Sequence, residues 1–258
     1  MSIPKSKSIL IERWDGAAYR LVLNRPEKGN ALSRELVQAL DDALQRCEQR
    51  QASLLVIEGM GAHFCSGFDL SDIASETDDS LLARFTRIEL MLQRLARAPF
   101  CTVAVAHGRV MGAGADLFAA CAVRLVQGDA VFAFPGATGF GLVLGSRRLA
   151  GLVGQGTATR WVTGGGTISA GEAVQSGLAS AQLADPAAVQ AAIDAAGTRV
   201  ADSKLYQQLS RALRGPDVGD DAHDLEMLVR SAARPGLQAR VAAYVARKTV
   251  KRPPVQST

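Results

Sequence analysis

The sequence predicts an α/β fold whose core is built of β-β-α units and is followed by a helical C-terminal portion. Short apolar, β-branched runs alternate with amphipathic helical stretches up to about Val162, and only helical patterns follow. Three glycine-bearing turns also come directly after predicted strands. With 258 residues, 48% of them hydrophobic, the chain has ample apolar side chains for a core. We place the boundary near Asp185, which gives a core at 1–184 and a helical region at 185–258.

The first third of the chain has the clearest local signals. Asp15-Gly16 lies between two β-type runs and is a strong hairpin signal. Ser33 is a natural N-cap for the amphipathic helix that follows it. The predicted order is strand, strand, helix, strand, over Ile9–Trp14, Tyr19–Leu23, Arg34–Arg50 and Ser53–Glu58.

The remaining elements are predicted from apolar periodicity and from helix start signals. Ser169 and Glu172 form a capping-box pattern, and Asp185-Pro186 starts another helix. The core elements after the third strand are a helix at Leu81–Ala98, a strand at Thr102–Ala106, a helix at Ala115–Cys121, strands at Val123–Val126 and Val131–Phe134, and short helices at Ser146–Val153 and Thr157–Val162. The C-terminal helices are Pro186–Ala201, Lys204–Leu213, Ala222–Ala233 and Gly236–Lys248.

The stretch from Cys101 to Cys121 combines a buried strand, the glycine-rich turn Gly108–Gly114 and a helix start. Free backbone N–H groups near Ala113 carry partial positive charge, and Asp116 lies about one turn further on. This arrangement suits an oxyanion site with an acid/base beside it. A purely structural turn is the alternative, because the helix dipole alone favours an aspartate in a first turn.

Composition excludes several classes of protein. The net charge of +4 is mild and the basic residues are scattered, so no nucleic-acid partner is expected. The cysteines form no C-x-x-C pair, so no zinc or other metal site is expected. No apolar run is long enough to span a membrane, and the first residues lack a signal-peptide pattern, so we expect a cytoplasmic protein.

Several segments, in this order and spacing, resemble the crotonase superfamily of enoyl-CoA hydratases and isomerases. They cover most of the chain and read LNRPEKGNALS, HFCSGFDL, GRVMGAGADLFAAC, LGSRRLAGLVG, VTGGGTISAGEAVQSGLAS and RPGLQARVAAYVARK. The resemblance implies a spiral of β-β-α repeats followed by helices that trimerise. A homotrimer or a dimer of trimers is therefore expected, with an acyl-CoA thioester as substrate and no cofactor.

The resemblance also implies particular site residues. In the family, two backbone N–H groups hold the thioester oxygen as it becomes an enolate, and here they fall on Phe68 and Ala113. A typical hydratase has two glutamates, whose positions here are Asp116 and Gly136, or Ala137 if the alignment slips by one. Hydration needs one group to deprotonate water and one to protonate the α-carbon, so these residues do not promise an efficient hydratase.

Further positions match places that contact CoA or substrate in the family. Tyr244 and Lys248 match C-terminal positions that approach CoA from a neighbouring chain, although helix packing would explain them equally well. Phe68 and Phe134 are candidates to line an acyl pocket. The complete set of expected binding residues is Lys28, Cys65, Ser66, Gly67, Asp69, Leu70, Gly112, Gly136, Tyr244 and Lys248.

The histidines and a pair of arginines are weaker candidates. His63 precedes the second glycine turn, and we expect it to lie at the surface or stabilise the turn, with proton transfer as the alternative. His107 ends the central strand, and we expect a packed, hydrogen-bonded residue rather than a base. His223 has no motif around it, and Arg147 and Arg148 are expected to pair with helix ends or carboxylates.

The sequence therefore predicts an enolate-stabilising acyl-CoA enzyme of the hydratase/isomerase type with one carboxylate, Asp116. Double-bond isomerisation, decarboxylation and thioester hydrolysis suit a single carboxylate at least as well as hydration does. A crotonase-fold protein that binds acyl-CoA without turnover, or serves as a scaffold, is the alternative from another class.

Overall fold

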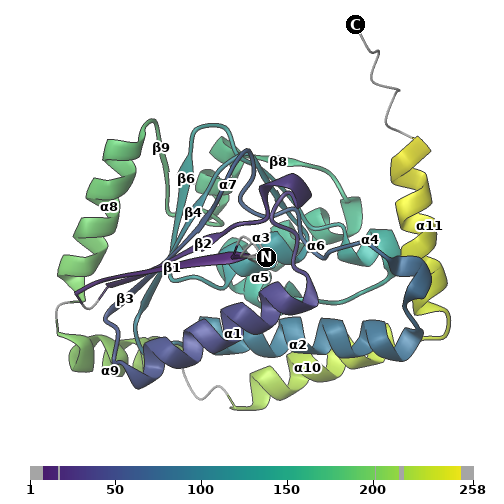
Figure 1. Ribbon diagram of the computed structural model, residues 1–258, viewed down its shortest axis with the longest axis horizontal. Helices are drawn as coiled ribbons and strands as arrows, with labels where there is room; N and C mark the ends of the chain where they lie inside the picture. Colours follow the sequence, from purple (N-terminus) through teal and green to yellow (C-terminus); the bar gives the residue numbers. More distant parts are fainter. Residues whose placement is uncertain (1–7, 17, 201, 215–217, 251–258) are drawn as a thin grey trace, which may run out of the picture.

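The computed structural model describes residues 8–250 apart from 17, 201 and 215–217, and its main sheet has six strands (Figure 1). The strand order is β1-β2-β3-β4-β6-β9, in which β1 and β2 form an antiparallel hairpin and the other neighbours are parallel. The Asp15-Gly16 hairpin is thus confirmed. The strands are β1 (Leu10–Asp15), β2 (Ala18–Leu23), β3 (Leu54–Gly59), β4 (Cys101–Ala106), β6 (Val123–Gln127) and β9 (Ala181–Leu183).

A second, three-stranded sheet consists of β5 (Arg109–Met111), β7 (Val131–Ala133) and β8 (Ile168–Ser169). Gly108 redirects the chain from β4 into β5 with φ of +57°, and a Cβ there would lie 2.0 Å from the carbonyl oxygen of Ala62. The sequence pattern predicts a turn at the position of β5 and only helices after Val162; β5, β8 and β9 correct both expectations. Strands of two or three residues are too short to show an alternating pattern.

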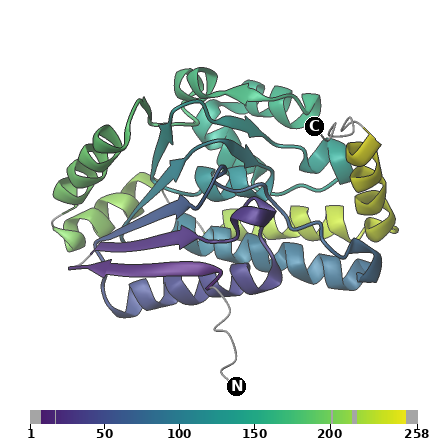
Figure 2. The same ribbon diagram turned by 45° about the horizontal axis from the view of Figure 1, so that its top comes forward.

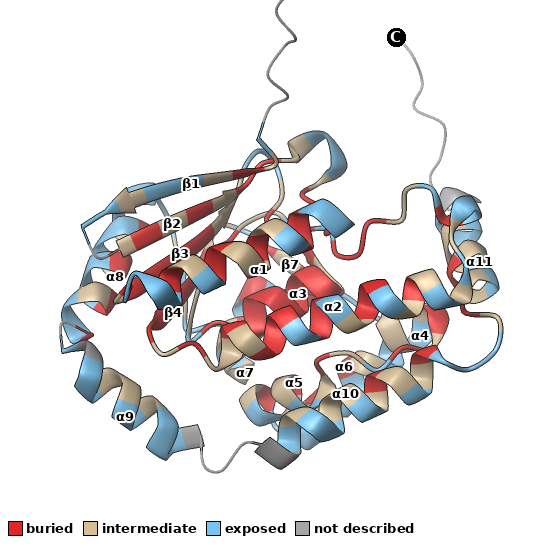
Figure 3. Ribbon diagram, turned by 60° about the horizontal axis from the view of Figure 1, so that its bottom comes forward, coloured by how far each residue is buried: buried red, intermediate tan, exposed pale blue. Residues whose placement is uncertain are grey.

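Helices cover both faces of the main sheet (Figure 2). Leu55 and Ile57 of β3 belong to the larger core, which also holds α1 (Arg34–Gln49), α2 (Asp78–Ala96) and α3 (Ala113–Ala119). The alternate residues of β3 face α8 (Pro186–Arg199), whose Val189 and Ile193 complete a second core. Figure 3 shows α3 buried behind the long helices α1 and α2.

The C-terminal helices pack back onto the core of their own chain. α10 lies along α2, and α11 packs against α4 and the start of α2. The glycine-rich connection after β7 contains α4, which the sequence analysis did not predict. α8 follows the predicted boundary at residue 185 but packs against the main sheet, so contacts cross that boundary. The division into two regions remains a prediction. The remaining elements are η1 (Pro26–Lys28), η2 (Ile73–Ser75), α4 (Gly136–Phe140), α5 (Ser146–Val153), α6 (Gln155–Gly164), α7 (Ala170–Ser176), α9 (Ser203–Arg214), α10 (Val218–Ala232) and α11 (Leu237–Val250).

Candidate active site

Two glycine turns, one after β3 and one between β5 and α3, come into close contact. Gly67 has φ of +96°, and a Cβ on it would lie 2.5 Å from the Met111 carbonyl oxygen and 3.5 Å from the Ala113 nitrogen. A Cβ on Gly114 would lie 2.5 Å from the carbonyl oxygen of Cys65. Real Cβ atoms do not approach other atoms this closely, so only glycine allows the two turns to meet.

The contact between the turns leaves two backbone N–H groups unpaired. Leu32 bonds to both neighbours of Phe68, donating to the Gly67 carbonyl at 2.8 Å and accepting from the Asp69 N–H at 3.2 Å. Ala113 is the first residue of α3, so its N–H has no acceptor within the helix. Among the described residues, neither the Phe68 N–H nor the Ala113 N–H has a hydrogen-bond partner.

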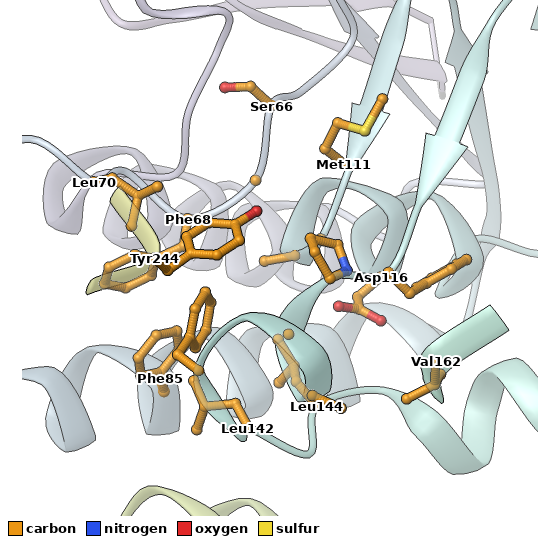
Figure 4. A pocket seen from close by; sticks show the side chains of 18 of the residues that line it. Ser66, Phe68, Leu70, Phe85, Met111, Asp116, Leu142, Leu144, Val162 and Tyr244 are labelled. Carbon is orange, nitrogen blue, oxygen red and sulfur yellow. The ribbon is translucent and has the colours of Figure 1, made fainter. Parts of the chain in front are cut away.

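Phe68 and Ala113 line the same cavity, which has a volume of about 60 Å³. This is several times the roughly 10–15 Å³ that one water molecule requires. Most of its wall is apolar and comes from α2, β5, α4, α5, α6 and the loops next to them (Figure 4). The apolar side chains around it are Leu70, Phe85, Met111, Phe134, Phe140, Leu142, Leu144, Leu149 and Val162.

Asp116 reaches this cavity from the first turn of α3 and is 6% exposed. Its N–H donates to the Gly112 carbonyl at 3.0 Å, which fixes the backbone of the residue. Its carboxylate packs against the backbone of Gly145, where a Cβ would lie 2.2 Å from Oδ1. Gly145 also has φ of +64°, so both its conformation and the space beside Asp116 require glycine.

Burial raises the pKa of the Asp116 carboxyl to about 8, because the ionised form is poorly solvated there. The Arg148 guanidinium opposes this rise in pKa, and Glu89 adds to it. A carboxyl with a pKa in this range can accept and return a proton near neutral pH, as general acid–base catalysis requires.

Arg148 connects Asp116 to a buried ion-pair network between helices. Its guanidinium forms a two-pronged pair with Glu89 of α2, at 2.7 and 2.6 Å, and lies 3.5 Å from Asp224 of α10. Arg147 pairs with Asp224 and Asp220, each at 2.9 Å. The network therefore fixes α5, whose N-terminus lies beside Asp116, to α2 and α10.

The sequence predicts that the two arginines pair with helix ends or carboxylates, but it does not identify their partners. Glu89 is 1% exposed and lies on the apolar face of α2, between Phe85 and Leu92 at helical spacing. A charged residue on an apolar face is a signal for a buried ion pair, and that signal is visible in the sequence.

The structure brings most of the expected binding residues to the cavity and leaves three outside it. Lys28 is exposed in η1, and among the described residues it does not line the cavity. Cys65 and Asp69 are buried behind the turn: the Cys65 thiol contacts the Asn30 carbonyl at 3.1 Å, and Asp69 pairs with Arg25 at 2.8 Å. The expected residues that do line the cavity are Ser66, Gly67, Phe68, Leu70, Gly112, Ala113, Asp116, Gly136, Tyr244 and Lys248.

Gly136 starts α4 at the cavity wall, where a Cβ would meet only the Leu142 carbonyl oxygen at 3.5 Å. Among the described residues that line the cavity, Asp116 is the only carboxylate. Tyr244 reaches the cavity of its own chain, with its ring edge-on to Phe140 at 5.3 Å. The approach to CoA from a neighbouring chain that the resemblance implies for Tyr244 stays a prediction.

The three histidines do not line this cavity. His107 Nε2 lies 2.9 Å from the Gly61 carbonyl oxygen, and His63 Nδ1 accepts a hydrogen bond from the Arg109 N–H at 3.3 Å. Both therefore connect the turn after β3 to the start of β5, and His223 lies on α10.

Comparison with known proteins gives consistent matches. The family model for enoyl-CoA hydratase/isomerase matches residues 15–223. A crystal structure of a candidate enoyl-CoA hydratase/isomerase from Bordetella parapertussis is 40% identical with a TM-score of 0.88, covering 96% of this chain and 100% of that one. The probable enoyl-CoA hydratase echA6 of Mycobacterium bovis is 33% identical over 167 residues, which are 64% of this chain and 66% of that protein.

The peroxisomal Delta(3,5)-Delta(2,4)-dienoyl-CoA isomerase of Arabidopsis thaliana is 28% identical over 141 residues, 50% of this chain and 51% of that protein. The chain therefore spans just under two thirds of the mycobacterial relative and about half of the plant relative. The fold is that of the crotonase superfamily. Within that superfamily, the chain belongs to the enoyl-CoA hydratase/isomerase family. In the part of the chain that is described, no helix is long and apolar enough to cross a membrane.

Proposed function

We propose that the protein forms an enolate from an acyl-CoA thioester. The Phe68 and Ala113 N–H groups bind the thioester oxygen, and Asp116 transfers the proton. The observation that carries this proposal is the convergence of two unpaired amides and one buried carboxyl on a single cavity. Backbone donors aimed at developing negative charge contribute about 2.7–4 kcal/mol each to transition-state stabilisation.

Isomerisation of a 3-enoyl to a 2-enoyl thioester is the reaction that this geometry supports best. The Asp116 carboxylate removes a proton from C2, and the electron pair of that C–H bond moves into the thioester oxygen. The dienolate then collapses as Asp116 returns the proton to C4, which moves the double bond into conjugation. One acid/base is sufficient, which agrees with the absence of a second carboxylate among the described cavity residues. The isomerase name of the plant relative supports the same choice.

Hydration is the second candidate, because the cavity has room for water. Asp116 would then take a proton from water as the oxygen attacks C3 and would deliver a proton to C2 afterwards. With one carboxylate performing both steps, we expect hydration to be the slower reaction. A binder without turnover is less well supported. Burying a carboxyl so that its pKa rises to about 8 is unfavourable for folding, and such strongly shifted groups cluster at functional sites.

The test is conversion of a 3-enoyl-CoA and hydration of crotonyl-CoA, measured by the gain or loss of the conjugated-thioester absorbance. We expect Asp116→Asn to lower the isomerisation rate by about 10²–10⁴-fold. In the wild type, kcat/KM should rise with pH and level off above about 8, where Asp116 is ionised.

Asp129→Asn is the matched control, because Asp129 is exposed and lies outside the cavity. Equal isomerisation rates for Asp116→Asn and Asp129→Asn would show that Asp116 has no acid–base role. If the wild type binds the thioester but converts neither substrate, the protein is a binder.

We also propose a trimer or a dimer of trimers, in the cytoplasm. The support for assembly is a stripe of exposed leucines on α9, where Leu205 and Leu209 are each 51% exposed and Leu213 is 86% exposed. Exposed apolar side chains spaced four apart on one helix are typical of a face that packs against another protein surface. The four cysteines are free and buried, which suits a reducing compartment.

A further inference from the structure

Tyr244 places a hydroxyl group inside a cavity with few other polar side chains. In Figure 4 its ring extends from α11 and its oxygen points away from the helix, toward the space between Ser66 and Asp116. The hydroxyls of the two cavity serines both bond to carbonyl oxygens, Ser66 to Lys28 at 3.2 Å and Ser146 to Leu144 at 3.5 Å. No described residue forms a hydrogen bond with the Tyr244 hydroxyl, so its proton is free for a ligand.

Contacts on three sides fix the ring of Tyr244. Phe140 packs edge-on to it at 5.3 Å between ring centroids, and the Lys248 ammonium lies 4.7 Å from the ring centroid. At Gly139 a Cβ would lie 3.0 Å from two carbon atoms of the ring, so the missing side chain leaves room for it. A rigid ring directs the hydroxyl without the loss of conformational freedom that a longer side chain would incur.

The hydroxyl lies on the side of the cavity where the proposed function places the thioester oxygen. Ser66 and Phe68 belong to one turn, so a hydroxyl that points into the space between Ser66 and Asp116 lies between that turn and the proposed acid/base. The Phe68 and Ala113 N–H groups supply two donors there. A carbonyl oxygen that becomes an enolate can accept a third hydrogen bond, because its negative charge increases along the reaction.

We propose that the Tyr244 hydroxyl donates a third hydrogen bond to the thioester oxygen and stabilises the enolate together with the Phe68 and Ala113 amides. This inference rests on the proposed function and assigns Tyr244 to the reacting end of the substrate. The hydroxyl keeps its own proton throughout, and Asp116 remains the group that moves the substrate proton.

The experiment is Tyr244→Phe, which removes one oxygen and keeps the ring that packs against Phe140. We expect kcat for isomerisation to fall by about 10²-fold with KM changed only a few-fold, as for the loss of one oxyanion donor. Tyr206→Phe is the matched control, because Tyr206 lies on α9 outside this cavity. Gly139→Ala is an independent variant that pushes the ring aside, and we expect it to give an intermediate loss of kcat.

A spectroscopic measurement separates this inference from the proposed function. Cinnamoyl-CoA is bound to Asp116→Asn and to the double variant Asp116→Asn/Tyr244→Phe, and the red shift of its absorbance reports how strongly the carbonyl is polarised. We expect a smaller red shift without the hydroxyl. Equal red shifts, or a Tyr244→Phe variant that raises KM and leaves kcat unchanged, would overturn the third-donor role while the proposed function stands. A hydroxyl-dependent red shift in a protein without turnover would instead support the donor and overturn the proposed function.

Discussion

Asp116 illustrates how one side chain acquires its chemistry from the atoms around it. The Gly112 carbonyl fixes its backbone, Gly145 packs against its carboxylate, and Arg148 places a positive charge nearby. Burial outweighs that charge, so the pKa rises to about 8. An aspartate at the same position of an exposed helix would be ionised at neutral pH.

The raised pKa predicts how the stability of the fold depends on pH. Between pH 4 and pH 8 the folded chain holds a proton on Asp116 that the unfolded chain has lost, so the free energy of unfolding falls as pH rises. Asp116→Asn removes this dependence. We expect the variant to match the wild type near pH 4 and to exceed it by on the order of 5 kcal/mol above pH 8, at about 1.4 kcal/mol per pKa unit.

Denaturant unfolding of the wild type and the variant across this pH range measures the difference. Asp129→Asn again serves as control, since Asp129 is exposed. A constant difference between Asp116→Asn and the wild type at all pH values would contradict a raised pKa at Asp116.

At the scale of elements, the Glu89–Arg148 pair connects α2 to α5 behind the cavity. Both side chains are largely buried, so each depends on the other for compensation of its charge. Asp224 of α10 adds a third helix to the connection. The position of the α5 N-terminus, and with it Gly145 beside Asp116, follows from these long-range contacts.

Arg148→Met should therefore leave the Glu89 charge buried without a cation beside it, with only the hydrogen bond from Gln93, and lower the free energy of unfolding by about 3–5 kcal/mol. The double variant Arg148→Met/Glu89→Leu should recover most of that loss, because both charges are then gone. Thermal or denaturant unfolding of the two variants checks this. In the single variant, the rise of kcat/KM with pH should also move to higher pH, since the cation that lowers the pKa of Asp116 is absent. An unaltered stability of Arg148→Met would exclude a structural role for the pair.

Local signals predicted the elements that carry them. The Asp15-Gly16 turn lies in a β1–β2 hairpin, and Ser33 caps α1 by accepting a hydrogen bond from the Leu36 N–H. The short elements β5, β8 and α4 were missed, because their stability comes from packing rather than from their own sequence. The Glu89–Arg148 pair is similarly non-local: 59 positions separate its members along the chain.

The candidate site was predicted more completely than the short elements. The glycine turns and Asp116 lie around one cavity, and glycines that permit such close approach are identifiable in a sequence. The roles of these residues stay a prediction. The burial of Cys65 and Asp69 behind the turn was not predicted, since it depends on contacts with Asn30 and Arg25 in the loop after β2. The orientation of Tyr244 likewise depends on how α11 packs against α4.

At the scale of the whole molecule, α9 differs from the other C-terminal helices in the large apolar side chains that it exposes. α8, α10 and α11 each pack against the core of their own chain, whereas α9 contacts it through Tyr206 and is otherwise largely exposed (Figure 3). Leu205, Leu209 and Leu213 are among its exposed residues. Such a stripe is an aggregation liability unless another surface covers it.

Replacing Leu209 by glutamate should dissociate the oligomer, because a charge in the centre of a buried apolar contact is strongly unfavourable. Light scattering coupled to size-exclusion chromatography measures the mass of the wild type and of Leu209→Glu. Gln208→Glu, at the neighbouring exposed position on the same helix, controls for the added charge. A wild-type protein that is monomeric at all concentrations would refute the assembly.

The contact between Gly145 and Asp116 has a consequence for the length of the acid. The loop backbone already occupies the space into which one more methylene would push a carboxylate. The short side chain of Asp116 and the close approach of Gly145 therefore fit each other, and the position of the loop compensates for the missing methylene. An alignment that scores position 116 alone would register a lost catalytic residue, whereas positions 116 and 145 considered together describe a pocket whose loop lies directly against its acid.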